Sequence, residues 1–133
     1  MTERELLNQA LVAREAAYAP YSDFRVGAAL LAEDGNVYNG CNVENASYSA
    51  TICAERTAFS AAIAAGARKF KAIAIAGGKG LKADEKTAPC GICRQVMAEF
   101  CDEDFTIVLG NETALSCYKL GDLLPLSFAL ENE

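Results

Sequence analysis

The sequence predicts a single α/β domain over residues 1–133, in which helices cover a mixed five-stranded sheet. Some segments repeat their apolar residues at helical spacing, whereas others are short, continuous apolar runs typical of buried strands. The two kinds of segment alternate in the order αββ-αβ-αβ-β, and no internal repeat or linker divides them. Strand–helix–strand connections join parallel strands by right-handed crossovers, so the helices are expected to pack on the sheet.

The first third of the chain is predicted to form a helix and a β-hairpin. Thr2 and Glu5 match the Thr-x-x-Glu capping box, which predicts a helix over residues 3–18. Asp34-Gly35 is a hairpin-turn signal between two strand-like segments. The two strands of this hairpin are predicted over residues 24–33 and 37–43.

The rest of the chain alternates helices and strands after a predicted loop over residues 44–52. One helix is predicted over Cys53–Ala65, where Gly66 closes it, and another over Cys90–Phe100. Cys53 and Cys90 each begin a helix, and such helix starts lie at one end of an α/β sheet, so the two thiols can converge. The remaining predictions are strands over 70–76, 105–109 and 114–118, a Gly- and Lys-rich loop over 77–89, and a helical turn over 122–124.

Composition and charge exclude several classes of function. The net charge of −6 disfavours binding to long DNA or RNA, which depends on Lys and Arg contacts to phosphates. The sequence has no apolar run near the ~20 residues of a membrane span. Met1–Asn8 lacks the basic start and apolar stretch of a secretory signal, so a cytoplasmic location is expected.

The chain contains six cysteines and no histidine. In a cytosolic chain with an apolar core, cysteines suggest metal binding, catalysis or ordinary burial rather than a disulfide framework. The absence of histidine removes Ser-His and Cys-His catalysis and every imidazole ligand. Any zinc must therefore be held by thiolates and carboxylates.

Two short motifs supply candidate zinc ligands. Cys90-Gly91-Ile92-Cys93 places two thiols on one side of a first helical turn, and Cys53 offers a third from another helix start. Three thiolates leave the fourth tetrahedral position open for water, as in catalytic zinc sites. Glu55 lies two residues beyond Cys53, close enough to exchange protons at that position without being a ligand.

Two other interpretations of these cysteines stay open at this point. Cys90 and Cys93 could be a thioredoxin-like redox pair, which leaves Cys53 and Glu55 without a role. A purely structural zinc site is the other, and Cys41 is then the candidate fourth ligand.

Over nearly its whole length the sequence resembles the small homotetrameric zinc-dependent cytidine deaminases. The resemblance implies a three-layer α/β/α fold and hydrolysis of free cytidine and 2'-deoxycytidine to uridine and 2'-deoxyuridine in pyrimidine salvage. It also implies a homotetramer with shared active sites. From the net charge and the lack of a long apolar run, no nucleic-acid or membrane partner is expected. The motifs that carry it are Ala19-Pro20-Tyr21-Ser22 through Phe24, Val26-Gly27-Ala28-Ala29-Leu30, Gly40-Cys41-Asn42-Val43-Glu44-Asn45-Ala46-Ser47-Tyr48, Cys53-Ala54-Glu55-Arg56-Thr57-Ala58, Pro89-Cys90-Gly91-Ile92-Cys93-Arg94-Gln95, and Leu123-Leu124-Pro125 through Phe128.

The same resemblance implies roles for residues outside the metal motifs. Phe24 would pack against the pyrimidine, and Asn42 and Glu44 would hold the ribose hydroxyls. The Ala54 N–H would meet the base carbonyl. The residues implied to reach a neighbouring subunit's site are Ala46, Tyr48 and Phe128. Without the resemblance, the two phenylalanines would be read as ordinary core and the two polar residues as turn and surface.

Charge balance at a three-thiolate zinc site suggests one further residue. Three thiolates around Zn²⁺ give a net charge of −1, to which Glu55 adds, and the two helix N-termini offset only part of it. Arg56 is the best candidate for the rest. A deaminase acting on a nucleoside antibiotic or an RNA base would share this metal core, but Asn42, Glu44 and the acidic charge favour a free nucleoside.

Overall fold

The five strands of the computed structural model form one mixed sheet in the order β2-β1-β3-β4-β5, and the structure describes residues 1–130. Strand β3 runs parallel to β4, and the other neighbouring pairs are antiparallel. Strands β2 and β3 both run opposite to β1, so the two crossovers through helices each join strands of the same direction, as predicted. The strands are β1 (Phe24–Ala32), β2 (Val37–Cys41), β3 (Phe70–Lys79), β4 (Thr106–Gly110) and β5 (Leu115–Lys119).

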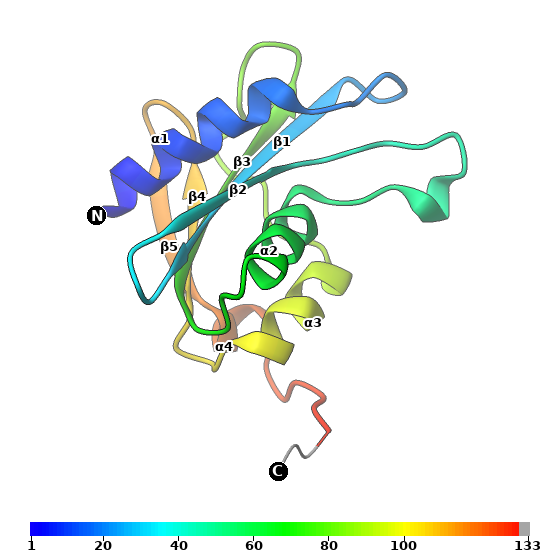
Figure 1. The fold of residues 1–133 in the computed structure, drawn as a ribbon. Coiled ribbons are helices and arrows are strands. Elements are labelled where there is room, and N and C mark those ends of the chain that lie inside the picture. The colour runs from blue at the N-terminus through cyan, green and yellow to red at the C-terminus, as the bar shows by residue number, and fades with distance from the viewer. Residues whose placement is uncertain (131–133) are drawn as a thin grey trace.

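Helices cover both faces of this sheet (Figure 1). Helix α1 (Glu3–Ala13) packs through Leu6, Leu7 and Ala10 onto alanines of β1 and β3. The intervening residues of the same strands point to the other face, where they pack with α2 (Ala54–Ala64) and α3 (Gly91–Phe100). This period-two alternation confirms the predicted three-layer α/β/α arrangement. The smaller helices are the 3₁₀ turns η1 (Arg14–Ala16) and η2 (Tyr48–Ala50), and α4 (Leu120–Leu123).

Two glycines let helices approach the sheet closely. A Cβ at Gly27 in β1 would overlap the backbone of α1 at Ala10, and one at Gly40 in β2 would overlap the backbone of α2 at Ala54 and Ala58. Helix α2 therefore lies directly against β2 at its first turns. This contact sets the position of Cys53, the residue that caps α2.

The C-terminal ends of three elements differ by two residues or more from those predicted, and α4 begins at Leu120 rather than at residue 122. Helix α1 ends at Ala13 rather than residue 18, because the chain tightens into η1. Strand β3 continues to Lys79, through two glycines whose composition predicted a loop. Strand β2 ends at Cys41. The Asn42 N–H still donates to the Val26 carbonyl at 3.2 Å, and the Asn42 side chain adds two bonds to β1: its Oδ1 accepts from the Val26 N–H at 2.9 Å and its Nδ2 donates to the Phe24 carbonyl at 2.8 Å.

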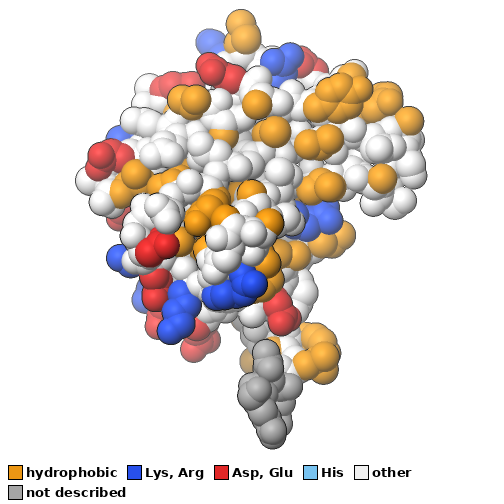
Figure 2. All heavy atoms as spheres, viewed as in Figure 1, with side chains coloured by type: hydrophobic (Ala, Val, Ile, Leu, Met, Phe, Trp, Pro, Cys, Tyr) orange, Lys and Arg blue, Asp and Glu red, His pale blue; other side chains and the backbone are white. Residues whose placement is uncertain are grey.

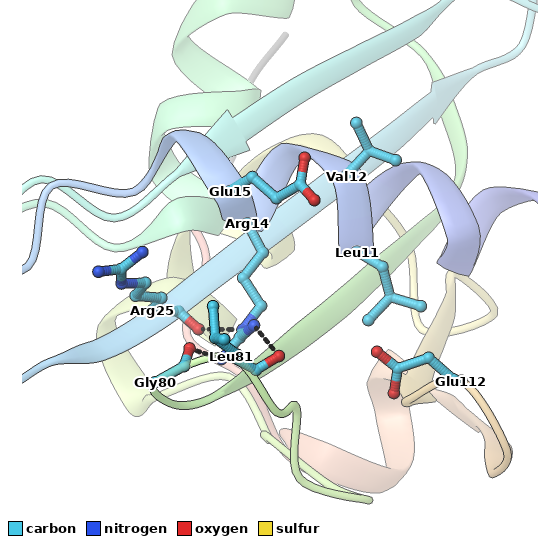
Figure 3. A pocket seen from close by; sticks show the side chains of 8 residues that line it. All are labelled: Leu11, Val12, Arg14, Glu15, Arg25, Gly80, Leu81 and Glu112. Carbon is cyan, nitrogen blue, oxygen red and sulfur yellow. Dashed lines mark hydrogen bonds between the residues drawn. The ribbon is translucent and has the colours of Figure 1, made fainter.

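Arg14 is buried (Figure 3), and its helical spacing from Leu7 and Ala10 places it on the apolar face of the first helix. Within residues 1–130 all the hydrogen bonds of its guanidinium go to backbone carbonyls, and they connect η1 to β1, to the end of β3 and to the segment that follows β3. A surface depression of about 370 Å³ adjoins this cluster, and none of its lining residues is a predicted site residue. The five acceptors are the carbonyls of Arg25, Gly78, Gly80, Leu81 and Lys82.

Residues 1–130 contain no helix with the length and apolarity needed to cross a bilayer.

Candidate metal centre and substrate site

Three cysteine thiols meet where α2 and α3 begin. Cys53 and Cys90 are the N-cap residues of the two helices, and Cys93 lies buried in the first turn of α3. Their Sγ atoms all lie within 4.8 Å of one another, and the Sγ atoms of Cys53 and Cys90 are 3.9 Å apart. The predicted convergence of the two motifs, which are far apart in the sequence, is confirmed.

The three thiols suit a zinc ion. Tetrahedral Zn²⁺ with Zn–S bonds of about 2.3 Å separates two sulfur ligands by about 3.8 Å, close to the Cys53–Cys90 separation of 3.9 Å. Thiolate is the ligand form of cysteine, and two helix N-termini favour it at this place. Cys41 is not a member of this cluster among residues 1–130, so a fourth thiolate from Cys41 is not supported.

The cluster already favours a thiolate. The hydrogen bond from Cys93 lowers the pKa of Cys53 to about 5, and contacts with Arg56 and Cys90 act in the same direction. The same hydrogen bond, together with burial and the nearby charge of Glu55, raises the pKa of Cys93 above its ordinary value. The hydrogen bond between the two sulfur atoms therefore favours negative charge at the cluster.

Glu55 is buried beside these thiols, with only 5% of its surface exposed. Burial raises the pKa of its carboxyl to about 7. Its own backbone N–H and the Cys93 thiol favour the charged form, whereas the negative charge of Cys53 opposes it. The carboxyl group thus lies next to the sulfur cluster, where it can take up and release a proton.

Arg56 brings a positive charge to the same cluster. Its Nη2 donates to the Cys53 Sγ at 3.6 Å and to the Thr51 carbonyl at 3.4 Å. Its Nε is buried and has no hydrogen-bond partner among the described residues. One guanidinium nitrogen of Arg56 therefore contacts the cysteine cluster, which is the hydrogen bond that the charge balance predicted.

A family model for the cytidine and deoxycytidylate deaminase zinc-binding region matches residues 1–109. The chain belongs to this family. It is 47% identical to the cytidine deaminase of Halalkalibacterium halodurans, over 99% of this chain and 98% of that protein. It is 41% identical to the cytidine deaminase of Mycobacterium tuberculosis, over 96% of this chain and 90% of that protein.

A solved structure from this deaminase family has the same fold as this chain. The crystal structure of the cytidine deaminase from Burkholderia pseudomallei superimposes with a TM-score of 0.89, at 50% identity, and covers 96% of this chain and 100% of that one. The predicted fold class and the resemblance are thereby confirmed. The zinc-binding region of the family also explains why Cys53 joins the Cys90–Cys93 pair, which the redox interpretation left unexplained.

Three of the residues expected to contact substrate in this deaminase form one hydrogen-bonded group. Asn42 is buried and holds the carbonyl of Phe24, the first residue of β1, while Glu44 lies two residues further along. The Glu44 Oε1 accepts from the backbone N–H groups of Tyr21 and Ser22, at 2.9 and 3.2 Å. The Asn42 amide is thus a backbone partner in this structure as well as a candidate ligand.

Ser22 is a residue of this group to which the sequence assigned no role. Its hydroxyl donates to the Glu44 carboxylate and accepts from the Phe24 N–H at 2.9 Å. The only signal in the sequence was its place in the Ala19–Phe24 motif. That motif marks a family resemblance but does not identify a partner.

Tyr48 and Glu44 line the same surface depression, of about 380 Å³. Thr51 lines it too, and the Thr51 carbonyl accepts from Arg56 Nη2, the same nitrogen that contacts the Cys53 Sγ. Ala54 is buried at the first position of α2, where a backbone N–H has no partner within its own helix.

Two other expected contacts stand apart from this group. Phe128 is 68% exposed on the C-terminal tail, where its carbonyl accepts from Gln95 Nε2 at 2.9 Å. Ala46 is exposed on the long connection between β2 and α2, which projects away from the sheet (Figure 1).

Proposed function

We propose that this chain is a zinc-dependent cytidine deaminase, which hydrolyses free cytidine and 2'-deoxycytidine to uridine and 2'-deoxyuridine with release of ammonia. The observation that carries the proposal is the cluster of three cysteine thiols with the buried carboxyl group of Glu55 beside it. Family membership and the names of the relatives give the reaction class.

Cys53, Cys90 and Cys93 would hold the Zn²⁺ ion. When bound, zinc supplies a Lewis acid that lowers the pKa of water. Glu55 then moves the protons. It takes one from the water that attacks C4 of the cytosine ring, and it delivers that proton to N3. Glu55 would then carry the proton of the new hydroxyl group on C4 to the amino group. The C4–N bond breaks, ammonia leaves, and the oxygen stays on the ring as a carbonyl.

Arg56 would act through the ligand sulfurs. A guanidinium 3.6 Å from the Cys53 Sγ withdraws electron density from the thiolate and offsets part of the negative charge of the site. The metal ligands then carry less negative charge toward the reacting water. Arg56 would be a positioning and charge-tuning residue, not one that contacts substrate.

The depression lined by Glu44 and Tyr48 favours a neutral nucleoside as substrate. Phe24 would pack against the pyrimidine, the Ala54 N–H would donate to the base carbonyl, and Asn42 and Glu44 would hold the sugar hydroxyls. None of the residues that line the depression is basic, and the Glu44 carboxylate would repel a phosphate. Both features argue against a nucleotide or an RNA base, in agreement with the net charge of −6.

A homotetramer with shared sites would use the residues that stand apart in one chain. Tyr48 and Phe128 are 81% and 68% exposed, an unusual condition for two aromatic side chains. Figure 2 shows further hydrophobic side chains exposed over α2. We infer that Ala46, Tyr48 and Phe128 complete the site of a neighbouring subunit. The cytoplasmic location and the role in pyrimidine salvage stay predictions.

The decisive experiment is a spectrophotometric assay of purified protein with cytidine. We expect uridine formation that is lost after treatment with a strong chelator and restored by Zn²⁺. Deoxycytidine should also react, whereas deoxycytidylate, which adds only the phosphate, should react far more slowly. A metal-loaded protein that leaves cytidine unchanged would refute the proposal.

A further inference from the structure

Ser22 uses both sides of its hydroxyl group to join two parts of the substrate site. The hydroxyl donates its proton to Glu44 Oε2, and its oxygen accepts from the Phe24 N–H at 2.9 Å. The backbone N–H of Ser22 donates to the other carboxylate oxygen of Glu44 at 3.2 Å. One small residue therefore fixes the orientation of Glu44 and the start of β1 together.

These bonds leave the Glu44 carboxylate nearly saturated. An ionised carboxylate offers about four acceptor positions. Tyr21 and Ser22 fill two on Oε1 through their backbone N–H groups, and the Ser22 hydroxyl fills one on Oε2. About one acceptor position remains, on Oε2. Glu44 can thus receive one hydroxyl donor from a ligand in the depression that it lines.

The same bonds keep Glu44 in its charged form. The Ser22 hydroxyl is the largest of the causes that lower the pKa of Glu44 below its ordinary value, and the N–H groups of Tyr21 and Ser22 add to it. Of the other residues that line the depression, only Tyr21 and Tyr48 are titratable, and none is cationic. The acceptor is therefore held by hydrogen bonds rather than by an ion pair.

We propose that Ser22 is a positioning residue for sugar recognition, which orients Glu44 so that its one remaining acceptor position receives a single hydroxyl of the nucleoside. This proposal rests on the proposed function. Ser22 acts through Glu44 and Phe24 and does not touch the reacting atoms. Its loss should therefore weaken substrate binding and leave the chemical step intact.

The test compares Ser22→Ala with Ser22→Thr, which keeps a hydroxyl at the same place. A hydrogen bond to a charged group is worth enough to change binding about tenfold. We expect KM for cytidine to rise about tenfold in Ser22→Ala, with kcat and zinc content unchanged, and Ser22→Thr to recover most of the loss. Thr113→Ala is the matched control, because it removes a loop hydroxyl that donates to Asn111 Oδ1 at 3.2 Å outside the site. An unchanged KM in Ser22→Ala, or a loss in kcat alone, would overturn the proposal.

A second measurement does not depend on activity. Carboxyl NMR titration should show the pKa of Glu44 moving upward in Ser22→Ala and staying in place in Thr113→Ala. If the protein fails to deaminate cytidine, the proposed function falls while this titration still reports on the link between Ser22 and Glu44. A Glu44 titration that is identical in wild type and Ser22→Ala would show that the link is absent.

Discussion

Glu55 and Arg56 are neighbours in the sequence, but burial gives them different tasks. The Glu55 carboxyl group is enclosed beside the sulfur cluster, where the charged form is disfavoured and a proton is readily held. Arg56 reaches the Cys53 sulfur with its guanidinium and keeps its charge. The Glu55 side chain is suited to moving protons and the Arg56 side chain to balancing charge. Substitution of each residue should therefore change the activity to a different extent.

Glu55→Gln should lower kcat by at least 10²- to 10⁴-fold, the usual loss when a positioned acid–base group is removed. Glutamine has the same shape but cannot take a proton. Because Glu55 is not a ligand in the proposed site, zinc content measured by mass spectrometry of the metal should equal that of the wild type. Near-normal turnover in a zinc-loaded Glu55→Gln protein would remove Glu55 from the mechanism.

Arg56→Gln should keep its zinc and lose activity by about tenfold or more, the value of a hydrogen bond to a charged partner. Arg56→Lys keeps the positive charge without the planar fork, so its kcat/KM should lie between those of Arg56→Gln and the wild type. The measurement pairs steady-state kinetics with metal analysis on the same preparations. Equal kcat/KM in all three proteins would mean that Arg56 serves only to support the Thr51 carbonyl.

At the scale of elements, the metal centre depends on where two helices start against the sheet. Helix α2 is held by its close approach to Gly40 in β2, and the helix α3 start is held by Arg94, whose Nε donates to the Pro89 carbonyl at 2.8 Å. The segment that leads from β3 to α3 begins at the Arg14 cluster. The position of Cys90 therefore depends on contacts at both ends of this segment.

Arg14→Leu should lower the free energy of unfolding by about 3 kcal/mol, because a buried polar group left without a partner costs about 1–3 kcal/mol. The Gly78 carbonyl, bonded to Arg14 Nη2 at 2.8 Å, is the buried acceptor that loses most. Urea denaturation at fixed protein concentration measures the change.

Arg68→Leu is the control for this prediction. Arg68 also donates to backbone carbonyls, those of Ile63 and Ala67, but these bonds are exposed to solvent. Its loss should change stability by only about 0.5 kcal/mol, the usual value at the surface. Similar losses in Arg14→Leu and Arg68→Leu would contradict the view that the buried Arg14 cluster organises this segment.

At the scale of the whole molecule, one chain leaves parts of its proposed site far from complete. Phe128 lies on the C-terminal tail, which extends away from the sheet (Figure 1), and among residues 1–130 its one hydrogen bond is the bond from Gln95 Nε2 to its backbone carbonyl. Two-thirds of this aromatic side chain is in contact with solvent, which is unfavourable, so we expect another surface to cover it. A closed symmetric assembly would supply that surface.

Mixed assemblies test whether sites are shared. Phe128→Ala should weaken cytidine binding by roughly 1–3 kcal/mol, the scale of a base–aromatic stack, and Glu55→Ala should be nearly inactive. The two variant proteins are refolded together and assayed at subsaturating cytidine. In the mixed assemblies, some sites pair an intact Glu55 with a neighbour's intact Phe128. Activity should then exceed the average of the two separate proteins. Glu55→Ala mixed with Glu55→Gln is the control, since no site can be restored; a Phe128 mixture that also stays at the average would exclude the shared site.

The sequence by itself determined the features that depend on neighbours along the chain. The capping box at Thr2 and Glu5, the turn at Asp34-Gly35 and the helix starts at Cys53 and Cys90 follow from local hydrogen bonding and periodicity, and the structure has them. The convergence of the cysteines was also predictable, because helix starts gather at one end of an α/β sheet. The metal site could therefore be assembled from short motifs.

Only the tertiary structure decided the roles of Arg14, Ser22 and Asn42. Arg14 binds a carbonyl 64 positions away, Glu44 is 22 positions from Ser22, and Asn42 bonds the backbone of β1 with its side chain. A polar residue has the same local pattern whether it faces water or a distant carbonyl. Whether the residue is exposed or bonded depends on how β1, β3 and the loop before α2 pack together. A buried polar group needs a hydrogen-bond partner, and the fold determines which group lies near enough.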